Sequence, residues 1–156
     1  MWLNSETFRN VVASTPLVSI DLVVQNQEGS ILLGQRLNRP AQGFWFVPGG
    51  RILKNESLDA AFSRLTDVEL GRPFQRGQAQ LLGVYEHFYS DSIFADQGDG
   101  PDTHYVVLGY RIVLPTTETL QPPHAQHDRY RWWTPTEARL SAEVHDNTRA
   151  YLDALR

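Results

Sequence analysis

The chain has 156 residues, 41% of them hydrophobic and 21% charged, with a formal net charge of -4 at pH 7. This length suits one domain with a single core, expected to span 1–156, and the negative charge argues against broad nucleic-acid binding. The sequence contains no cysteine, which excludes disulfides and thiolate metal sites and is compatible with a cytoplasmic protein. No apolar run approaches the ~20 residues that cross a membrane, so we expect no membrane partner.

The first part of the chain predicts a helix and a β-hairpin. Ser5 is a candidate cap for a helix from Glu6 to Ala13 that ends before Pro16. The apolar segments that follow are predicted to pair as two strands, Leu17–Gln25 and Ser30–Arg36. Asp21 lies within the first strand, where alternation permits two placements. It either faces solvent or lies on an inner face, where its carboxylate could stabilise positive charge at a reacting carbon.

The segment 43–72 is the part around which the chain is organised. It contains a short apolar strand, Phe44–Val47, then a Pro-Gly-Gly break, a polar loop and an amphipathic helix. Ser57 is a plausible N-cap of this helix, and Gly71 is a natural stop. Four residues at helical spacing form its predicted apolar face: Leu58, Ala61, Phe62 and Leu65.

The second half of the chain alternates strands with polar loops and ends in helices. The expected strands are Gln78–Tyr89, His104–Leu114 and Arg129–Trp133. Between them lie a Gly/Asp-rich loop over 90–103 and a long irregular loop over 116–128. Thr134 and Pro135 are typical of a helix start, and a terminal helix is expected near Asp146–Leu155.

Three arginines flank the central helix and form a candidate phosphate clamp: Arg36, Arg51 and Arg64. A guanidinium group matches the geometry of a phosphate and keeps its charge. Single arginines are more often solvated, so the interpretation depends on all three lying near one loop. For Arg64 we favour an ion pair with Glu56, which leaves Arg36 and Arg51 for phosphate.

Four further side chains permit both a structural and a chemical interpretation. His87 and Tyr105 lie in predicted strands, where a structural role is at least as common as a catalytic one. Gln126 and His127 lie in the second long loop, where surface hydrogen bonding is the more frequent role. A glutamine carbonyl is nevertheless a suitable ligand for a hard cation, and a histidine with a pKa of about 6.5 can take a proton near neutral pH.

The N-terminus carries three apolar residues around the first helix: Trp2, Leu3 and Phe8. Their pattern favours core packing over ligand binding. The alternative is that an aromatic ring here stacks on a base, since a ring offers contact area at little entropic cost.

Five residues of the central segment resemble the Nudix box: Gly50, Glu56, Arg64, Glu69 and Gly71. That family hydrolyses nucleoside diphosphates linked to another moiety, using a divalent metal on a loop–helix–loop. The resemblance implies an α+β fold, an α/β/α sandwich with a mixed, curved sheet. The family pattern has Glu at 65 and 68 and a bulky apolar residue at 66 and 72. This chain departs from it at four positions: Leu65, Thr66, Val68 and Arg72.

These departures remove carboxylates from the chemical end of the box. Positions 65, 68 and 69 are expected to share one face of a helix that turns about 100° per residue, and Glu69 alone keeps a carboxylate there. Mg²⁺ takes about six oxygen ligands, so the others must come from backbone, another loop, water and substrate. We therefore expect a base outside the helix to activate the attacking water, and the bond that is broken to differ from that of an ordinary Nudix enzyme.

Within the superfamily, the chain is similar to the GDP-mannose mannosyl hydrolases. The matching segments are 17–26, 32–51, 84–89, 103–111 and 125–133. This similarity implies hydrolysis of the glycosidic C–O bond of GDP-mannose, or of GDP-glucose, to GDP and an inverted free hexose. It also implies a homodimer with one Mg²⁺ per subunit.

The similarity assigns roles to individual residues. The implied Mg²⁺ ligands are the Gly49 carbonyl, Glu69 and Gln126. The implied general base is His127. The other implied catalytic residues act on the departing GDP or at the sugar: Arg36, Arg51 and Tyr105 on the former, Asp21 and His87 on the latter. The implied substrate-binding residues are Trp2, Leu3, Phe8 and Arg36.

Two other functions remain open on the sequence. A Nudix pyrophosphohydrolase would attack phosphorus and release a nucleoside monophosphate and a sugar phosphate. A non-catalytic domain would keep the degraded box only to bind a nucleotide. The 90–103 loop does not match the family, so the sequence leaves the choice among mannose, glucose and fucose open.

Overall fold

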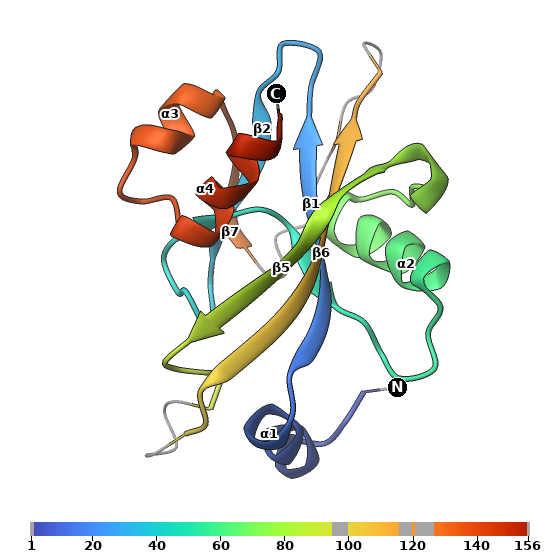
Figure 1. Cartoon of the computed structure of the whole chain (residues 1–156), viewed down its shortest axis with the longest axis vertical. Coiled ribbons are helices and arrows are strands. Elements are labelled where there is room, and N and C mark those ends of the chain that lie inside the picture. The colour runs from blue at the N-terminus through green and yellow to red at the C-terminus, as the bar shows by residue number, and fades with distance from the viewer. Residues whose placement is uncertain (1, 95–99, 116–119, 121–126, 156) are drawn as a thin grey trace.

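The computed structural model describes residues 2–94, 100–115, 120 and 127–155, with positions 127 and 128 described by their backbone alone. Its helices are α1 (Ser5–Ser14), α2 (Leu58–Leu70), α3 (Pro135–Leu140) and α4 (Asp146–Leu152). Its strands are β1 (Leu17–Gln25), β2 (Ile31–Arg36), β3 (Trp45–Phe46), β4 (Gly49–Arg51), β5 (Gln80–Tyr89), β6 (Thr103–Val113) and β7 (His127–Trp133). Short 3₁₀ turns cover Arg76–Gln78 and Asp153–Leu155 (Figure 1).

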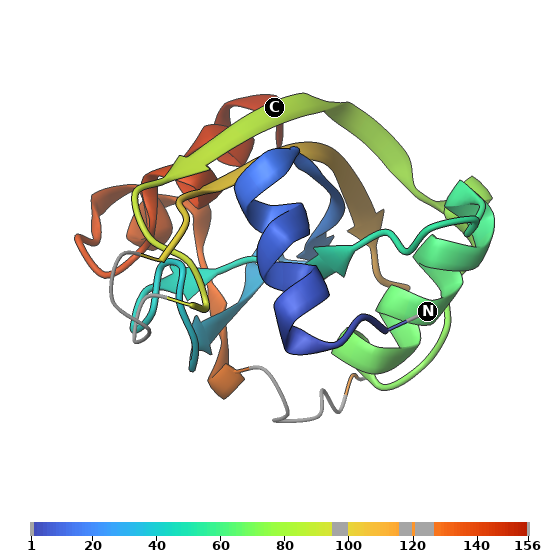
Figure 2. The ribbon, with the colours of Figure 1, turned by 90° about the horizontal axis from the view of Figure 1, so that it is seen from below.

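The strands form one mixed sheet organised around β1. Its order is β3-β2-β1-β6-β5, with β4 also paired to β1 and β7 to β2. β1 runs parallel to β6 and antiparallel to β2 and β4. α2 covers one face of the sheet, α3 and α4 cover the other, and α1 lies across one end (Figures 1 and 2). The expected α+β fold with a mixed sheet between helices is confirmed.

The side chains of β1 alternate between two hydrophobic cores. Ile20, Leu22 and Val24 pack in the core that contains α2, whereas Val23 packs in the core that contains Tyr151 of α4. Because helices cover both faces, the whole strand after Val18 is buried. Asp21 is therefore buried too, and the solvent-facing placement that alternation permitted is wrong.

The ends of α2 follow the predicted signals. The Ser57 hydroxyl accepts a hydrogen bond from the Ala60 amide, and Gly71 takes the left-handed conformation with φ 86°. Ala61, Phe62 and Leu65 are buried as predicted. Leu58 is exposed, contrary to the predicted apolar face, because the entire first turn from 57 to 60 is exposed to solvent.

Several predicted boundaries need correction. The cap of α1 is Asn4, whose side chain accepts from the Thr7 amide, and not Ser5. β5 begins at Gln80 because the three residues before Ala79 form a 3₁₀ turn. β7 begins at His127, which places that residue in a strand and not in the predicted loop. Among the described residues, no helix is long and apolar enough to cross a membrane.

Candidate active site

The Pro-Gly-Gly segment, predicted as a break, continues into the short strand β4. Gly49 pairs with Asp21 of β1, and Gly50 pairs with Ile20. A Cβ atom on Gly49 would lie 2.3 Å from the Ile20 carbonyl oxygen and 2.7 Å from Asp21 Oδ1. A Cβ atom on Gly50 would lie 2.5 Å from Leu65 Cδ2. Glycine at both positions lets the start of the loop–helix–loop approach β1 and α2 closely.

Glu56 and Arg64 form the ion pair that the sequence favoured. Arg64 Nε lies 2.7 Å from Glu56 Oε2, and Arg64 Nη2 also donates to the Arg51 carbonyl oxygen at 2.9 Å. The Leu53 amide donates to Glu56 Oε1 at 2.9 Å. The hydrogen bond from Arg64 holds the pKa of Glu56 below its ordinary value. This network fixes the loop before α2, so Arg64 has a structural role, and Arg36 and Arg51 remain as the candidates for binding phosphate.

Glu69 is the one buried carboxylate of α2, a helix whose residues are all described. Burial raises its pKa to about 7, an effect that the charge of Arg36 opposes and that of Asp21 adds to. Leu65 packs against Gly50, whereas Val68 is 43% exposed. The predicted common face therefore holds for 65 and 69, four residues apart, while position 68 is turned away from it.

The donor chemistry at the start and end of this motif suits Mg²⁺. The Glu69 carboxylate and the Gly49 carbonyl are hard oxygen ligands, and a nearby cation would keep a buried carboxylate ionised. Mg²⁺ commonly combines one or two carboxylates with water and substrate phosphates. The described residues contain no group of three or more His, Cys, Asp or Glu that could hold a metal. Gln126, the third predicted ligand, lies outside the described residues.

Asp21 is held by a residue that the sequence did not indicate. The Tyr151 hydroxyl donates a 2.6 Å hydrogen bond to Asp21 Oδ2, and both side chains are buried. Burial raises the pKa of Asp21 to about 7, against the hydrogen bond from Tyr151 and the charge of Arg36. Tyr151 lies in the predicted terminal helix, but no local pattern marks a contact between residues this far apart in the sequence.

His87 and Tyr105 lie near this pair. The His87 ring is 6.3 Å from the Tyr151 ring, and burial lowers the pKa of His87 to about 4, so the imidazole is neutral at physiological pH. His87 Nε2 is buried and has no hydrogen-bond partner among the described residues. Burial raises the pKa of Tyr105, and the charges of Arg36 and Arg51 oppose that rise. Tyr105 thus remains a phenol that can donate a hydrogen bond.

Arg36 is the residue that connects these groups. Its positive charge acts on the pKa values of Asp21, Glu69 and Tyr105. Its Nε donates to the Pro40 carbonyl at 2.9 Å, and its backbone exchanges hydrogen bonds with 43 and 44, so the intervening loop folds back on it. The structure therefore brings together predicted residues from four separate elements.

A cavity of about 440 Å³, which we call the Arg36 cavity, opens beside this cluster. Its lining includes Phe8, Arg36 and Tyr105, all predicted site residues, and also Ile93. The Arg51 guanidinium lies 4.8 Å from the centre of the Phe8 ring, so the second clamp arginine borders the same region. The cavity combines cationic and aromatic groups, which suits a nucleoside diphosphate.

The three apolar residues near the N-terminus were expected either to pack in the core or to stack on a base, and they differ in how far they are buried. Phe8 is half-buried and packs edge-on against Phe94 at 5.8 Å. Leu3 is also half-buried. Trp2 is 74% exposed, with the Arg64 guanidinium 6.0 Å from its ring, so core packing is wrong for this residue.

For His127, the predicted general base, the structure describes the backbone position. His127 pairs with Arg36 where β7 begins beside β2. The side chain of His127 lies outside what the structure describes. Position 127 is nevertheless brought next to the arginine that connects the site.

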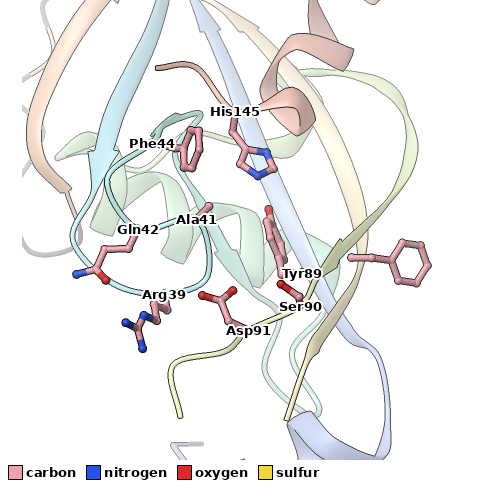
Figure 3. Close-up of a pocket in the computed structure, with 9 residues that line it drawn as sticks. Arg39, Ala41, Gln42, Phe44, Tyr89, Ser90, Asp91 and His145 are labelled. Carbon is pink, nitrogen blue, oxygen red and sulfur yellow. The ribbon is translucent and has the colours of Figure 1, made fainter. Parts of the chain in front are cut away.

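A second cavity, of about 490 Å³, is lined by Tyr89, from the predicted strand segment that could face a sugar, and by residues such as His145 to which the sequence assigned no role (Figure 3). We call it the Tyr89 cavity. It shares Arg39 with the Arg36 cavity. This shared residue shows that the two cavities are adjacent. Burial raises the pKa of Tyr89.

Comparisons with known proteins agree with this arrangement. The NUDIX domain model matches residues 15–155. The low-salt glycan biosynthesis protein Agl8 of Haloferax volcanii is 40% identical over 146 residues, which cover 93% of this chain and 85% of that protein.

Two solved structures share the fold. The MutT NUDIX hydrolase of Burkholderia pseudomallei has a TM-score of 0.71 and 25% identity, covering 92% of this chain and 100% of that one. The NUDIX domain of Shewanella oneidensis NrtR, solved with ADP ribose, has a TM-score of 0.67 and 19% identity, covering 98% and 96%.

Proposed function

The chain belongs to the NUDIX family of hydrolases, and from that premise we propose that it hydrolyses GDP-mannose, and also accepts GDP-glucose, to GDP and the free hexose. In this proposal, water attacks the anomeric carbon and inverts it, with Mg²⁺ as cofactor. The similarity to a protein named for glycan biosynthesis supports a nucleotide sugar as the substrate class.

One observation carries the choice of carbon over phosphorus. Of the helix positions that hold carboxylates in the family pattern, Leu65 packs on Gly50, Val68 is exposed, and Glu69 alone is buried as an acid. A helix with one buried carboxylate at these positions is poorly suited to bind the several metal ions that would activate a water for attack at phosphorus. A single ion can still neutralise the diphosphate of a leaving group.

Glu69 and the Gly49 carbonyl would hold this Mg²⁺, together with Gln126, water and the phosphates. When bound, the ion supplies positive charge that stabilises the diphosphate as it departs. Arg36 and Arg51 add their charges at the same place, and Tyr105 donates a hydrogen bond to a phosphate oxygen. Because GDP leaves as a stabilised anion, the reaction needs no general acid of the kind that assists a sugar alkoxide.

The chain's own residues complete the reaction at the sugar. His127 takes a proton from water as the oxygen bonds to the anomeric carbon, and the bond to GDP breaks on the opposite face. The Asp21 carboxylate, held by Tyr151, stabilises the positive charge that develops on the sugar ring. Neutral His87 lies beside this pair and contributes a polar ring without repelling that charge.

We propose that the active form is a homodimer. Trp2 is exposed and lies at the end of the chain that leads into the Phe8 side of the Arg36 cavity. An exposed indole suits contact with a partner subunit and with the guanine base.

The test is to incubate the protein with GDP-mannose and Mg²⁺ and to follow the phosphorus-containing products by ³¹P NMR and the free sugar by ¹H NMR. The proposal predicts GDP and free mannose. Formation of GMP and mannose 1-phosphate would instead establish a pyrophosphohydrolase, and an absence of turnover with binding intact would establish a nucleotide-binding domain.

A further inference from the structure

The Tyr89 cavity presents polar groups and aromatic rings from three parts of the chain. Tyr89 ends β5 and is followed by Ser90 and Asp91, Phe44 comes from the loop after β2, and His145 is the N-cap of α4. Figure 3 shows the Tyr89 hydroxyl pointing towards the His145 ring, with Phe44 beside that ring and the Asp91 carboxylate facing the open space. A volume of about 490 Å³ lies within the usual size of small-molecule sites.

Two hydrogen-bond donors in this cavity are fixed by one residue. The backbone N–H of Asn147 donates to His145 Nδ1 at 3.1 Å, and its side-chain Nδ2 donates to the Tyr89 hydroxyl oxygen at 3.1 Å. Burial lowers the pKa of His145, so the ring is neutral, and its proton lies on Nε2 because Nδ1 is an acceptor. Burial raises the pKa of Tyr89, so its hydroxyl stays protonated. Both groups are therefore oriented as donors before a ligand arrives.

The other groups complement these donors. The Asp91 carboxylate is an acceptor that can take two hydroxyl groups, and Ser90 can either donate or accept. The Phe44 ring packs edge-on against His145 at 5.2 Å and offers an apolar edge to the cavity. Arg39 also lines the cavity, and the negative charge of Asp91 offsets its positive charge, so the lining offers a phosphate no excess of positive charge. Neutral donors, one carboxylate and an aromatic ring instead suit a polyhydroxylated ring without charge.

The cavity is also placed at the reacting end of the nucleotide site. Arg39 lines both cavities, and the Tyr89 ring lies 6.3 Å from that of Tyr105 and 6.4 Å from that of His87. A ligand whose diphosphate lies at Arg36 can thus extend its other end towards Tyr89.

We propose that the Tyr89 cavity is the hexose subsite, and that Asp91, His145 and Tyr89 determine which hexose the enzyme accepts. This assignment rests on the proposed hydrolysis of a nucleotide sugar. It predicts that changes in this cavity alter recognition of the sugar and leave recognition of GDP intact.

The test uses Asp91→Asn and His145→Asn in the full-length protein. Asparagine is a favoured N-cap residue, so His145→Asn keeps the cap of α4 while it removes the ring. Leu140→Gln, at a position 80% exposed, is the control. We would measure kcat/KM for GDP-mannose and GDP-glucose, and separately the Kd for GDP with Mg²⁺ by calorimetry.

Loss of a hydrogen bond to a charged group lowers kcat/KM by about tenfold or more, so Asp91→Asn should show this loss. Both variants should shift the ratio of GDP-mannose to GDP-glucose turnover, with GDP affinity equal to that of the control. Unchanged kcat/KM and an unchanged ratio in both variants, in a wild type that cleaves GDP-hexoses, would overturn the subsite alone. An equal fall in GDP affinity would also overturn it. A wild type that cleaves no GDP-hexose would overturn the proposed function as well.

Discussion

The Tyr151 hydroxyl donates a 2.6 Å hydrogen bond to the carboxylate of Asp21, which joins the last helix to the first strand inside the protein. Asp21 lies on the central strand and Tyr151 is fully buried. A buried carboxylate is costly unless it is hydrogen-bonded, so this contact lowers the cost of burying Asp21 and fixes the orientation of its carboxylate. In the proposed reaction, Tyr151 is therefore a positioning residue that acts through Asp21.

Tyr151→Phe should lower kcat by about tenfold, because it removes one hydrogen bond to a charged group that acts in the transition state. KM for GDP-mannose should change little, since Tyr151 has no predicted contact with the nucleotide. The matched control is Tyr85→Phe, whose ring packs 4.6 Å from that of Tyr151. Steady-state kinetics of both variants would contradict this role if the two lost kcat equally, or if the loss lay in KM.

Glu56 and Glu69 belong to the same motif but should respond differently to amide substitution. Glu56→Gln weakens the ion pair with Arg64, so we expect a loss of about 1–3 kcal/mol in the free energy of unfolding and an unchanged Mg²⁺ affinity. Glu69→Gln should weaken Mg²⁺ binding by about tenfold or more, since the charged ligand is lost. Mg²⁺ titration by calorimetry in the presence of GDP, beside urea unfolding, separates the two. Equal Mg²⁺ affinities in both variants would refute the assignment.

The buried acid Glu69 should also make stability depend on pH when metal is removed. Its pKa rises from the ordinary 4.5 to about 7 in the folded protein, so protonation of Glu69 favours the folded state. This contribution to the free energy of unfolding is fully present below pH 4.5 and is lost as the pH rises through 7. Relative to Glu69→Gln, the wild type in chelator should lose about 3 kcal/mol of unfolding free energy between these values. Urea unfolding at pH 4.5, 6 and 8 measures the difference, which Mg²⁺ at pH 8 should reduce. A difference that stays constant with pH would show that Glu69 has an ordinary pKa.

Local signals predicted most of the elements, because caps, turns and hydrophobic periodicity are short-range properties. Ser57, Gly71 and the Thr134-Pro135 start all function as predicted. β4 was missed because its pairing comes from β1, and two adjacent glycines carry no strand signal. The same limit applies to Asp21, whose burial depends on helices covering both faces of the sheet.

The residues of the candidate site that could be predicted from sequence are mainly those that belong to a sequence motif. The Glu56–Arg64 pair and the position of Glu69 follow from the spacing of the box. Tyr151 and Asn147 come from α4, distant in sequence from the strands they contact, and the sequence offers no signal for either contact. Of the Tyr89 cavity, the sequence indicated only the strand segment that ends at Tyr89; the contributions of Asp91 and His145 were missed, since the cavity forms only when three separate segments meet.

His127 should govern the acidic limb of the rate profile. As a general base it acts when unprotonated, so kcat/KM should rise with pH through about 6.5, the ordinary histidine pKa. His127→Gln should be slower by about 100-fold or more and should lose this limb. His124→Gln, a nearby histidine in the sequence, is the control and should keep it. An unchanged pH profile in His127→Gln would refute this assignment and would point to Asp21, whose pKa burial raises to about 7, as the group that sets the limb.

The proposed reaction differs from that of a pyrophosphohydrolase in the atom that water attacks, which is carbon and not phosphorus. Hydrolysis of GDP-mannose in ¹⁸O-water with Mg²⁺, followed by mass spectrometry of both products, tests it most directly. If water attacks carbon, the heavy oxygen appears in mannose and GDP contains none. Heavy oxygen in the nucleotide or in a sugar phosphate would contradict this prediction and would place the attack at phosphorus.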